Sequence, residues 1–328
     1  MGRSAWFNLR DLNQARIVLI VAVVIFGAAA LGLPGFLTAA NLIAIVRSVA
    51  VLGILALGMS VVIIGRGIDL SMVAVMAMSV AWYLQLLGDG MPDEAALALV
   101  LGGVLAIGLL QGYLVAYADV PAIFVTLAGG SFVFGYVRSQ LIPSDAVPVP
   151  NGHWVEILGG LRYFGVPIEV YLFAALSGAL FLFLRYTKWG RYVYYAGDNP
   201  AAARNIGIPV RPMLVLRYAL SALMAFTAGL LTAASLHSIN TRVVNSTLLY
   251  DIVLVAVIGG IGLSGGKGGV RNVLVGALLI GIMLNAMTLI DIPLLHQNLI
   301  KSTVLLLAII IDGLLNPRDE QTAQQGDI

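Results

Sequence analysis

The sequence consists largely of apolar runs that are too long and too continuous for a water-soluble domain. Hydrophobic residues make up 60% of its 328 positions, charged residues only 10%, and the mean hydropathy is +0.99. Soluble domains carry about 25% charged residues. Inside a bilayer, backbone groups must be hydrogen-bonded within the protein, so a spanning chain forms helices or a closed barrel. Because the runs lack the alternating polar positions of barrel strands, the sequence predicts an all-α polytopic membrane protein.

A helical span needs about 20 apolar residues. On that basis we expect ten spans within a single transmembrane domain, 17–315. The first run has no cleavage site before a soluble domain, so we expect it to be retained behind a short N-terminal segment, 1–16; a tail, 316–328, follows the last. The predicted spans are 17–33, 42–64, 68–87, 95–117, 121–142, 168–184, 213–236, 248–265, 270–290 and 294–315.

The basic residues predict the orientation of these spans. With the N-terminus in the cytoplasm, 13 of the 18 lysines and arginines fall on the cytoplasmic side and five on the outer side. This asymmetry agrees with the positive-inside rule. Both termini are therefore expected in the cytoplasm, together with a basic loop, 185–212, whereas a long loop, 143–167, is expected outside.

The titratable residues suggest little chemistry of their own. The chain has no cysteine and only three scattered histidines, so neither a disulfide nor a metal site is expected. An ion-coupled carrier would need carboxylates at mid-membrane depth. Here Asp69, Asp119, Asp251 and Asp291 lie near the ends of predicted spans. The small net charge, +2, gives no reason to expect nucleic acid as a partner.

The stretch GGIGLSGGKGG, 259–269, partly matches three functional motifs. Its glycines fit the dinucleotide pattern G-x-G-x-x-G, but that motif requires a βαβ unit and an acidic residue about 20 positions later. Lys267 resembles the lysine of a phosphate-binding loop, although no Ser or Thr follows it. Ser264 lies in a G-x-S-G pattern of intramembrane serine proteases, but the only later histidine, His296, is predicted at the opposite membrane face. A glycine-rich cytoplasmic turn between two spans explains the stretch most simply.

A short helix with start and stop signals is predicted inside the basic loop. Asn199 is a favourable N-cap, Pro200 suits the first helical position, and Gly207 can end the helix in the left-handed conformation. Its shape suits docking, and a plain interfacial helix is the alternative. At the start of the third span, Asp69 follows Arg66 by three residues, so it is either a functional intramembrane group or a structural helix cap.

Three segments together carry a resemblance to a known family. They are GIDLS at 67–71, GRYVYYAGDNPAAARNIGI at 190–208 and DIVLVAVIGGIGLSGGKGGV at 251–270. In order and spacing they resemble the permease subunits of bacterial ABC importers for monosaccharides such as ribose, xylose, arabinose and galactose. PAIFVTLAG at 121–129 and Asn285 fit the same pattern, and the resemblance extends from about 40 to 315.

The resemblance implies a transporter subunit, not an enzyme, in the bacterial inner membrane. It implies a cytoplasmic ABC ATPase that carries the ATP, so that this chain needs no cofactor, a periplasmic sugar-binding protein, and a second copy or a sister permease. The helix 200–206 corresponds to the family's coupling helix. Its implied contacts with the ATPase are Asn199, Pro200, Ala202, Ala203, Arg204 and Gly207. Implied structural motif residues are Gly67, Asp69, Ser71, Gly190, Arg191, Gly259, Gly260, Gly265, Gly266, Gly268 and Asn285.

The chain departs from the family pattern at Val73, Gln111, Tyr195-Ala196 and Ala286. These departures affect packing and the pathway, so they leave the sugar open, and no residue of the substrate pathway is predicted. A branched-chain amino-acid permease of similar architecture is the main alternative. An ion-coupled secondary carrier and a membrane hydrolase that uses Ser264 are the others.

Overall fold

The computed structural model describes residues 14–315, so the predicted tail and most of the predicted N-terminal segment lie outside the described residues. The chain is mostly helical between these limits. The helices are α1 (Gln14–Gly32), α2 (Ala39–Ile64), α3 (Met72–Gly88), α4 (Asp93–Tyr117), α5 (Ala122–Gln140), α6 (Trp154–Gly160), α7 (Ile168–Tyr186), α8 (Lys188–Asp198), α9 (Pro200–Asn205), α10 (Val210–Leu236), α11 (Leu248–Gly259), α12 (Val270–Leu289) and α13 (Leu294–Leu315). The short strands are β1 (Ala146–Pro148), β2 (Arg162–Tyr163), β3 (Val166–Pro167) and β4 (Ser238–Asn240), and a 3-10 helix covers Thr241–Asn245.

Ten apolar helices correspond to the ten predicted spans. Seven of them, α1, α2, α4, α5, α7, α10 and α12, are long and apolar enough to cross a membrane. The other three, α3, α11 and the described apolar part of α13, are shorter. The predicted all-α polytopic architecture is confirmed.

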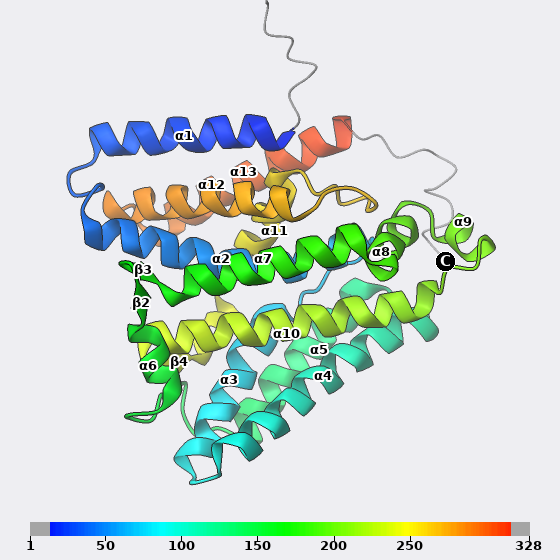
Figure 1. Cartoon of the computed structure of the whole chain (residues 1–328), viewed down its shortest axis with the longest axis horizontal. Helices are drawn as coiled ribbons and strands as arrows, with labels where there is room; N and C mark the ends of the chain where they lie inside the picture. Colours follow the sequence, from blue (N-terminus) through cyan, green and yellow to red (C-terminus); the bar gives the residue numbers. More distant parts are fainter. Residues whose placement is uncertain (1–13, 316–328) are drawn as a thin grey trace, which may run out of the picture.

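The connections between these helices gather at two ends of the molecule (Figure 1). One end, called here the coupling end, carries segment 65–71, α8, α9 and the turn 260–269. The opposite end, called here the far end, carries α6 and the strands. The predicted basic loop thus lies at the coupling end and the predicted outer loop at the far end, while the assignment of the coupling end to the cytoplasm stays a prediction from the basic residues.

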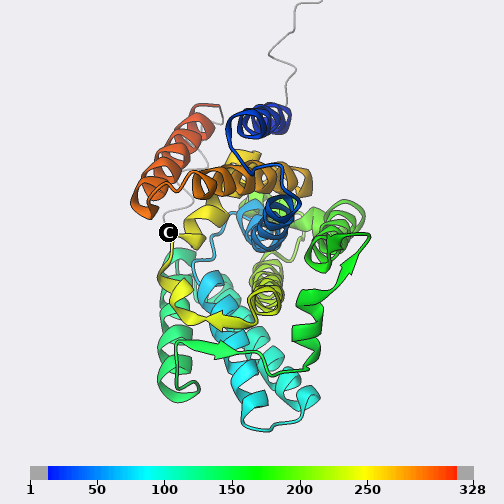
Figure 2. The ribbon, with the colours of Figure 1, turned by 90° about the vertical axis from the view of Figure 1, so that its left-hand side faces the viewer.

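Two long helices form the centre of the bundle. α2 is buried without interruption from Leu52 to Ile64, and α10 packs against α2, α3, α4 and α6. Figure 2 shows α2 and α10 in the middle of the molecule, with α1 and α13 at its edge. The buried residues are mostly Ala, Val, Leu, Ile and Gly. Lipid tails are as apolar as these side chains, so no hydrophobic force drives the helices together, and the small Ala and Gly residues let them pack closely instead.

Two predicted span ends are wrong. The third span is predicted to start at residue 68, but α3 begins at Met72, because 65–71 runs as a partly buried loop and Ser71, not Asp69, occupies the N-cap. The eighth span was predicted to reach residue 265, but α11 ends at Gly259. Gly260 has φ +98°, a left-handed conformation that stops the helix.

The predicted outer loop packs onto the far end of the bundle. β1 pairs antiparallel with β4, and α6 lies against α10. Arg242 Nε and Arg138 Nε donate to the two Asp145 carboxylate oxygens at 2.8 and 2.9 Å. These hydrogen bonds, that from Arg242 foremost, hold the pKa of the Asp145 carboxyl below its ordinary value. The loop is therefore a structured cover, which leaves side chains such as Phe164 fully exposed.

Candidate coupling site

The helix α9 has the start and stop signals that the sequence predicts. Asn199 Oδ1 accepts a hydrogen bond from Ala202 N at 2.9 Å, and Pro200 occupies the first helical position. After the helix, Gly207 has φ +80°, and its N–H donates to Arg204 O at 3.0 Å while Ile208 N donates to Ala203 O at 3.0 Å. This pair of bonds is the Schellman motif, which satisfies the last carbonyls of a helix.

A small apolar cluster fixes α9 onto its own chain. Ala203 and Ile208 are buried together with Ala196 of α8 and Val210 of α10. The opposite side of α9 is open: Ala202 and Arg204 are exposed, and Ile206 is 73% exposed. Of the alanine pair that the resemblance assigns to the ATPase contact, only Ala202 is accessible, since Ala203 packs inward.

Two of the family segments meet at the end of α2, directly before the GIDLS segment. Gly266 N donates to Ile64 O, the last carbonyl of α2, at 2.7 Å. Gly197 of α8 lies against the same carbonyl, and a Cβ added there would overlap it. Gly265 lies between Gly197 and Arg66. We call residues 64–67, Gly197 and 265–266 the coupling junction. The sequence predicts these segments separately and gives no signal that they touch.

Further contacts connect α8 to both neighbouring membrane helices. Tyr194 OH donates to Gly268 O at 3.0 Å, and burial raises the pKa of this phenol. Gly190 N donates to Thr187 Oγ1 at 2.9 Å, which caps α8 directly after α7. Since Gly190 also lies against the backbone of α7, the corner between α7 and α8 is tight. Arg191, by contrast, is exposed and projects from the first turn of α8. Through these contacts α8 touches α2, α7 and the segment that leads into α12.

The loop 65–71 is held by a buried carboxylate. Asp69 is 1% exposed, and it accepts hydrogen bonds from Ser71 N at 3.0 Å, Ser71 Oγ at 2.6 Å and Ser221 Oγ of α10 at 2.6 Å. Gly67 lies close to the Tyr218 hydroxyl, where a Cβ would stand 2.9 Å from its oxygen. Asp69 thus ties the loop to α10, which favours the structural of the two sequence interpretations.

An arginine is buried beside this loop. Arg217 of α10 is 2% exposed, and its guanidinium fills the space next to Gly65, where any Cβ would overlap it. In the described part of the chain, its Nε and Nη1 have no hydrogen-bond partner. Nearby, Gln111 Oε1 lies 3.0 Å from Ser71 Oγ, so one departure from the family pattern touches one of its motif residues.

The remaining motif residues lie between α11 and α12 or at the far end. Asn272 Nδ2 donates to Gly259 O at 2.6 Å, which holds the two helices together next to Gly260. Asn285 forms a reciprocal amide pair with Asn41 of α2, at 2.8 and 3.1 Å. Asn285 therefore joins α2 to α12 away from the coupling end.

Comparisons with known proteins identify the family of this chain. A family model described as branched-chain amino acid transport system / permease component matches residues 41–311, most of the chain. The chain belongs to this family of ABC permease components. The permease is 32% identical to the ribose import permease protein RbsC of Escherichia coli strain K12, over 94% of this chain and 95% of the relative.

Other relatives carry related names. The permease is 30% identical to the xylose transport system permease protein XylH of Haemophilus influenzae, over 93% of this chain and 98% of that one. It is 29% identical to the L-arabinose ABC transporter permease protein AraH of Azospirillum brasilense, over 92% and 88%. The comparison with solved structures found no match. The expected resemblance to sugar importer permeases is confirmed, as is the expectation of a multi-pass inner-membrane protein.

The geometry of the permease argues against an enzyme built on the glycine-rich turn. The turn 260–269 joins two helices, whereas a dinucleotide or phosphate loop follows a strand. Ser264 precedes α12 and His296 follows it. At 1.5 Å per residue, this 20-residue helix separates them by about 30 Å. Ser264 and His296 therefore cannot act on one bond.

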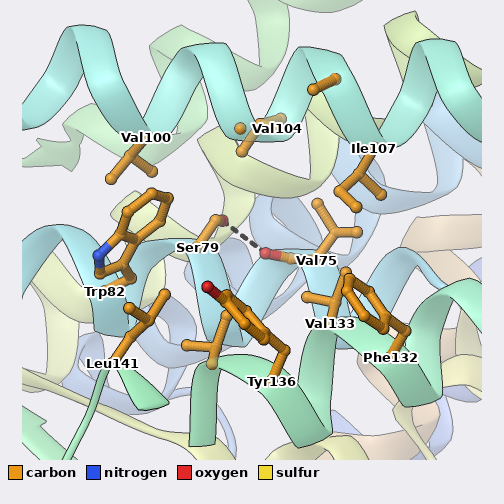
Figure 3. Close-up of a pocket in the computed structure, with 13 residues that line it drawn as sticks. Val75, Ser79, Trp82, Val100, Val104, Ile107, Phe132, Val133, Tyr136 and Leu141 are labelled. Atoms are coloured by element: carbon orange, nitrogen blue, oxygen red, sulfur yellow. Dashed lines mark hydrogen bonds between the residues drawn. The ribbon is translucent and has the colours of Figure 1, made fainter.

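One pocket of the permease lies among the membrane helices, between α3, α4 and α5 (Figure 3). Its volume is about 280 Å³, and its lining is mostly apolar, with Trp82 and Val104 on its walls. The Tyr136 hydroxyl points toward Ser79, whose own hydroxyl is bonded to Val75 O. So few polar groups do not form a binding site for a sugar, and the pocket does not identify the substrate pathway.

Proposed function

We propose that this chain is the transmembrane subunit of an ATP-driven importer for a monosaccharide or a related polyol, working by alternating access. The single observation that carries the proposal is the link between α9 and the coupling junction: α9 presents an open face outward and packs on α8, whose Gly197 lies against the last carbonyl of α2. The names of the relatives, which refer to ribose, xylose and arabinose, support the sugar class.

In this proposal a cytoplasmic ATPase docks on the open face of α9, formed by Ala202, Arg204 and Ile206. Closure of the ATPases around ATP displaces α9, and the contacts of α8 with Ile64 and Gly268 carry the motion to α2 and α12. The bundles then open toward the other side. ATP binds only to the ATPase, so the purified permease is expected neither to bind nor to hydrolyse it.

The partners on the other side follow from the same proposal. A periplasmic sugar-binding protein delivers the substrate to the far end, where the exposed tip of the β2–β3 hairpin, with Phe164, is available for contact. A second copy of the permease or a sister permease completes the path.

A branched-chain amino acid is the second candidate substrate, because the family model carries that description. Uptake assays with radiolabelled ribose, xylose, arabinose and leucine would decide between the classes. An ion-coupled carrier has less support: the buried Asp251 is paired with Lys301, whose Nζ lies 2.9 Å from Asp251 Oδ1 and 2.7 Å from Thr247 Oγ1.

The experiment that tests the proposal is affinity purification of the chain from its native membrane in mild detergent, with mass spectrometry of the proteins that accompany it. We expect an ATPase with phosphate-binding loops to co-purify. Ile206→Glu, on the open face of α9, should abolish that association. The matched control is Ile157→Glu, since Ile157 is 57% exposed on α6 at the far end. A chain that takes up sugar without any ATPase would refute the proposal.

A further inference from the structure

A second pocket lies at the coupling end, away from the open face of α9. It is enclosed by the last turns of α7, the first turns of α8 and the start of α12, and its volume is about 380 Å³. Arg185, Arg191 and Arg271 line it, one from each of the three helices. Arg191 is one of the family motif residues, and the proposed coupling mechanism uses none of the three side chains.

The pocket concentrates positive charge that the protein itself does not neutralise. None of the three guanidinium groups is hydrogen-bonded to, or ion-paired with, another residue whose side chain the structure describes; Arg185 stands only against the Tyr186 ring, at 5.8 Å. No acidic residue is among the described residues that line the pocket. Arginine stays charged at any physiological pH, and its planar fork suits the oxygens of a phosphate group.

The start of α12 adds to this potential. Its N-cap is Gly269, so no side chain caps the first backbone N–H groups of this 20-residue helix, and Gly269 through Asn272 border the pocket. Free N–H groups and the helix dipole favour an anion at this position. The three arginines and the helix start act in the same direction from different elements.

One wall of the pocket is apolar. Phe181 and Leu184 of α7 form it. Next to it, Tyr186 and Trp189 are 66% and 40% exposed. Exposed Tyr and Trp at the end of a membrane helix mark the level of the lipid headgroups. A ligand in this pocket would therefore meet both cationic and apolar side chains.

We propose that this pocket binds a phosphate group, and the apolar wall indicates that its source is an anionic phospholipid of the cytoplasmic leaflet, with inorganic phosphate as the other source. Basic pockets between membrane helices on that side accommodate such headgroups. A bound lipid would brace the corner between α7 and α8 against α12, next to the coupling junction. The proposal concerns binding alone and does not depend on which substrate is transported.

The test uses the full chain in nanodiscs and in detergent. Native mass spectrometry after addition of phosphatidylglycerol or phosphatidylcholine measures lipid retention. Thermal unfolding with and without millimolar inorganic phosphate measures whether the chain binds inorganic phosphate, the other source. The variants are Arg191→Gln combined with Arg271→Gln, and the control Lys188→Gln. Lys188 is exposed on the same helix as Arg191 but does not line the pocket.

We expect the unaltered chain and the control to retain phosphatidylglycerol in preference to phosphatidylcholine. Each arginine removed should weaken retention about fivefold, hence about 25-fold for the double variant. Stabilisation of the unaltered chain by inorganic phosphate, lost in the double variant, would support the site with the other source. Equal retention and equal phosphate response in all three chains would overturn the proposal. So would a double variant that binds lipid normally but loses its ATPase, since the pocket would then be a protein contact.

Discussion

The coupling junction can be tested by a single methyl group at Gly197. A Cβ at this position would stand 2.9 Å from Gly266 N and 3.0 Å from the Ile64 carbonyl carbon, and closer still to its oxygen. Heavy atoms pack at about 3.5 Å or more, so these two contacts alone would push α8 away by about 0.5 Å, and the nearer Ile64 oxygen requires a larger shift. The atoms in the way are backbone, which cannot rotate aside. The displacement strains the Gly266 N to Ile64 O hydrogen bond that closes the junction.

The expected magnitude follows from two contributions. Overpacking of a tight site costs about 1–3 kcal/mol, and a buried backbone group left without its partner costs a similar amount. Because α8 can move, the two overlap, and we expect about 2 kcal/mol. This corresponds to a shift of about 30-fold in the balance between docked and undocked α8.

The assay is limited trypsin digestion of the purified chain, followed at Arg204, which is exposed beside the junction. Gly197→Ala should be cleaved there many times faster than the unaltered chain. Gly178→Ala is the control, because an added Cβ on this α7 glycine meets nothing within 4 Å. If both variants are cleaved at the rate of the unaltered chain, the junction does not hold α8 in place.

Three further predictions concern other parts of the chain. Gly207→Val should lower substrate-stimulated ATP hydrolysis in the reconstituted complex, because φ +80° costs a β-branched residue about 1–3 kcal/mol. Asp251→Asn should lower the free energy of unfolding of the detergent-purified chain by about 3–5 kcal/mol, measured by thermal unfolding, because the buried Lys301 loses its anionic partner. The Asp145 carboxylate, paired with Arg242, should stabilise the folded chain at neutral pH. This stabilisation is measured as the difference in melting temperature between the unaltered chain and Asp145→Asn. It should be lost as the pH falls through the lowered pKa of this carboxyl, below 3.8.

Each of these predictions has a matched comparison. Gly207→Asn should couple normally, since Asn tolerates the left-handed conformation and the space around Gly207 is open; equal coupling by the Val and Asn variants would contradict the role of the turn. Combining Asp251→Asn with Lys301→Met should recover part of the lost stability, and no recovery would mean that the pair is not the cause. A pH-independent difference for Asp145→Asn would exclude the carboxylate as its source.

Helix ends and membrane spans could be predicted from the sequence because they depend on residues that are neighbours along the chain. The capped helix α9 has the ends that Asn199 and Gly207 predict. The apolar runs predicted the ten helices, whose length is dictated by the bilayer. The predicted start of the third span was wrong where a partly buried loop takes the place of the first helical turn, as at Asp69. The carboxylate of Asp69 accepts a hydrogen bond from Ser221, which lies 152 positions away in the chain and gives no local signal.

The sequence by itself determined that the chain spans the membrane as helices, because no other arrangement satisfies so many backbone groups in lipid. It also determined the family, through motifs in a fixed order. Only the tertiary structure decided that Ile64, Gly197 and Gly266 meet, that Arg217 is buried, and that three arginines from separate helices surround one pocket. These features depend on packing between helices far apart in the chain, and a glycine or an arginine in a sequence does not show which backbone or which charge will lie beside it.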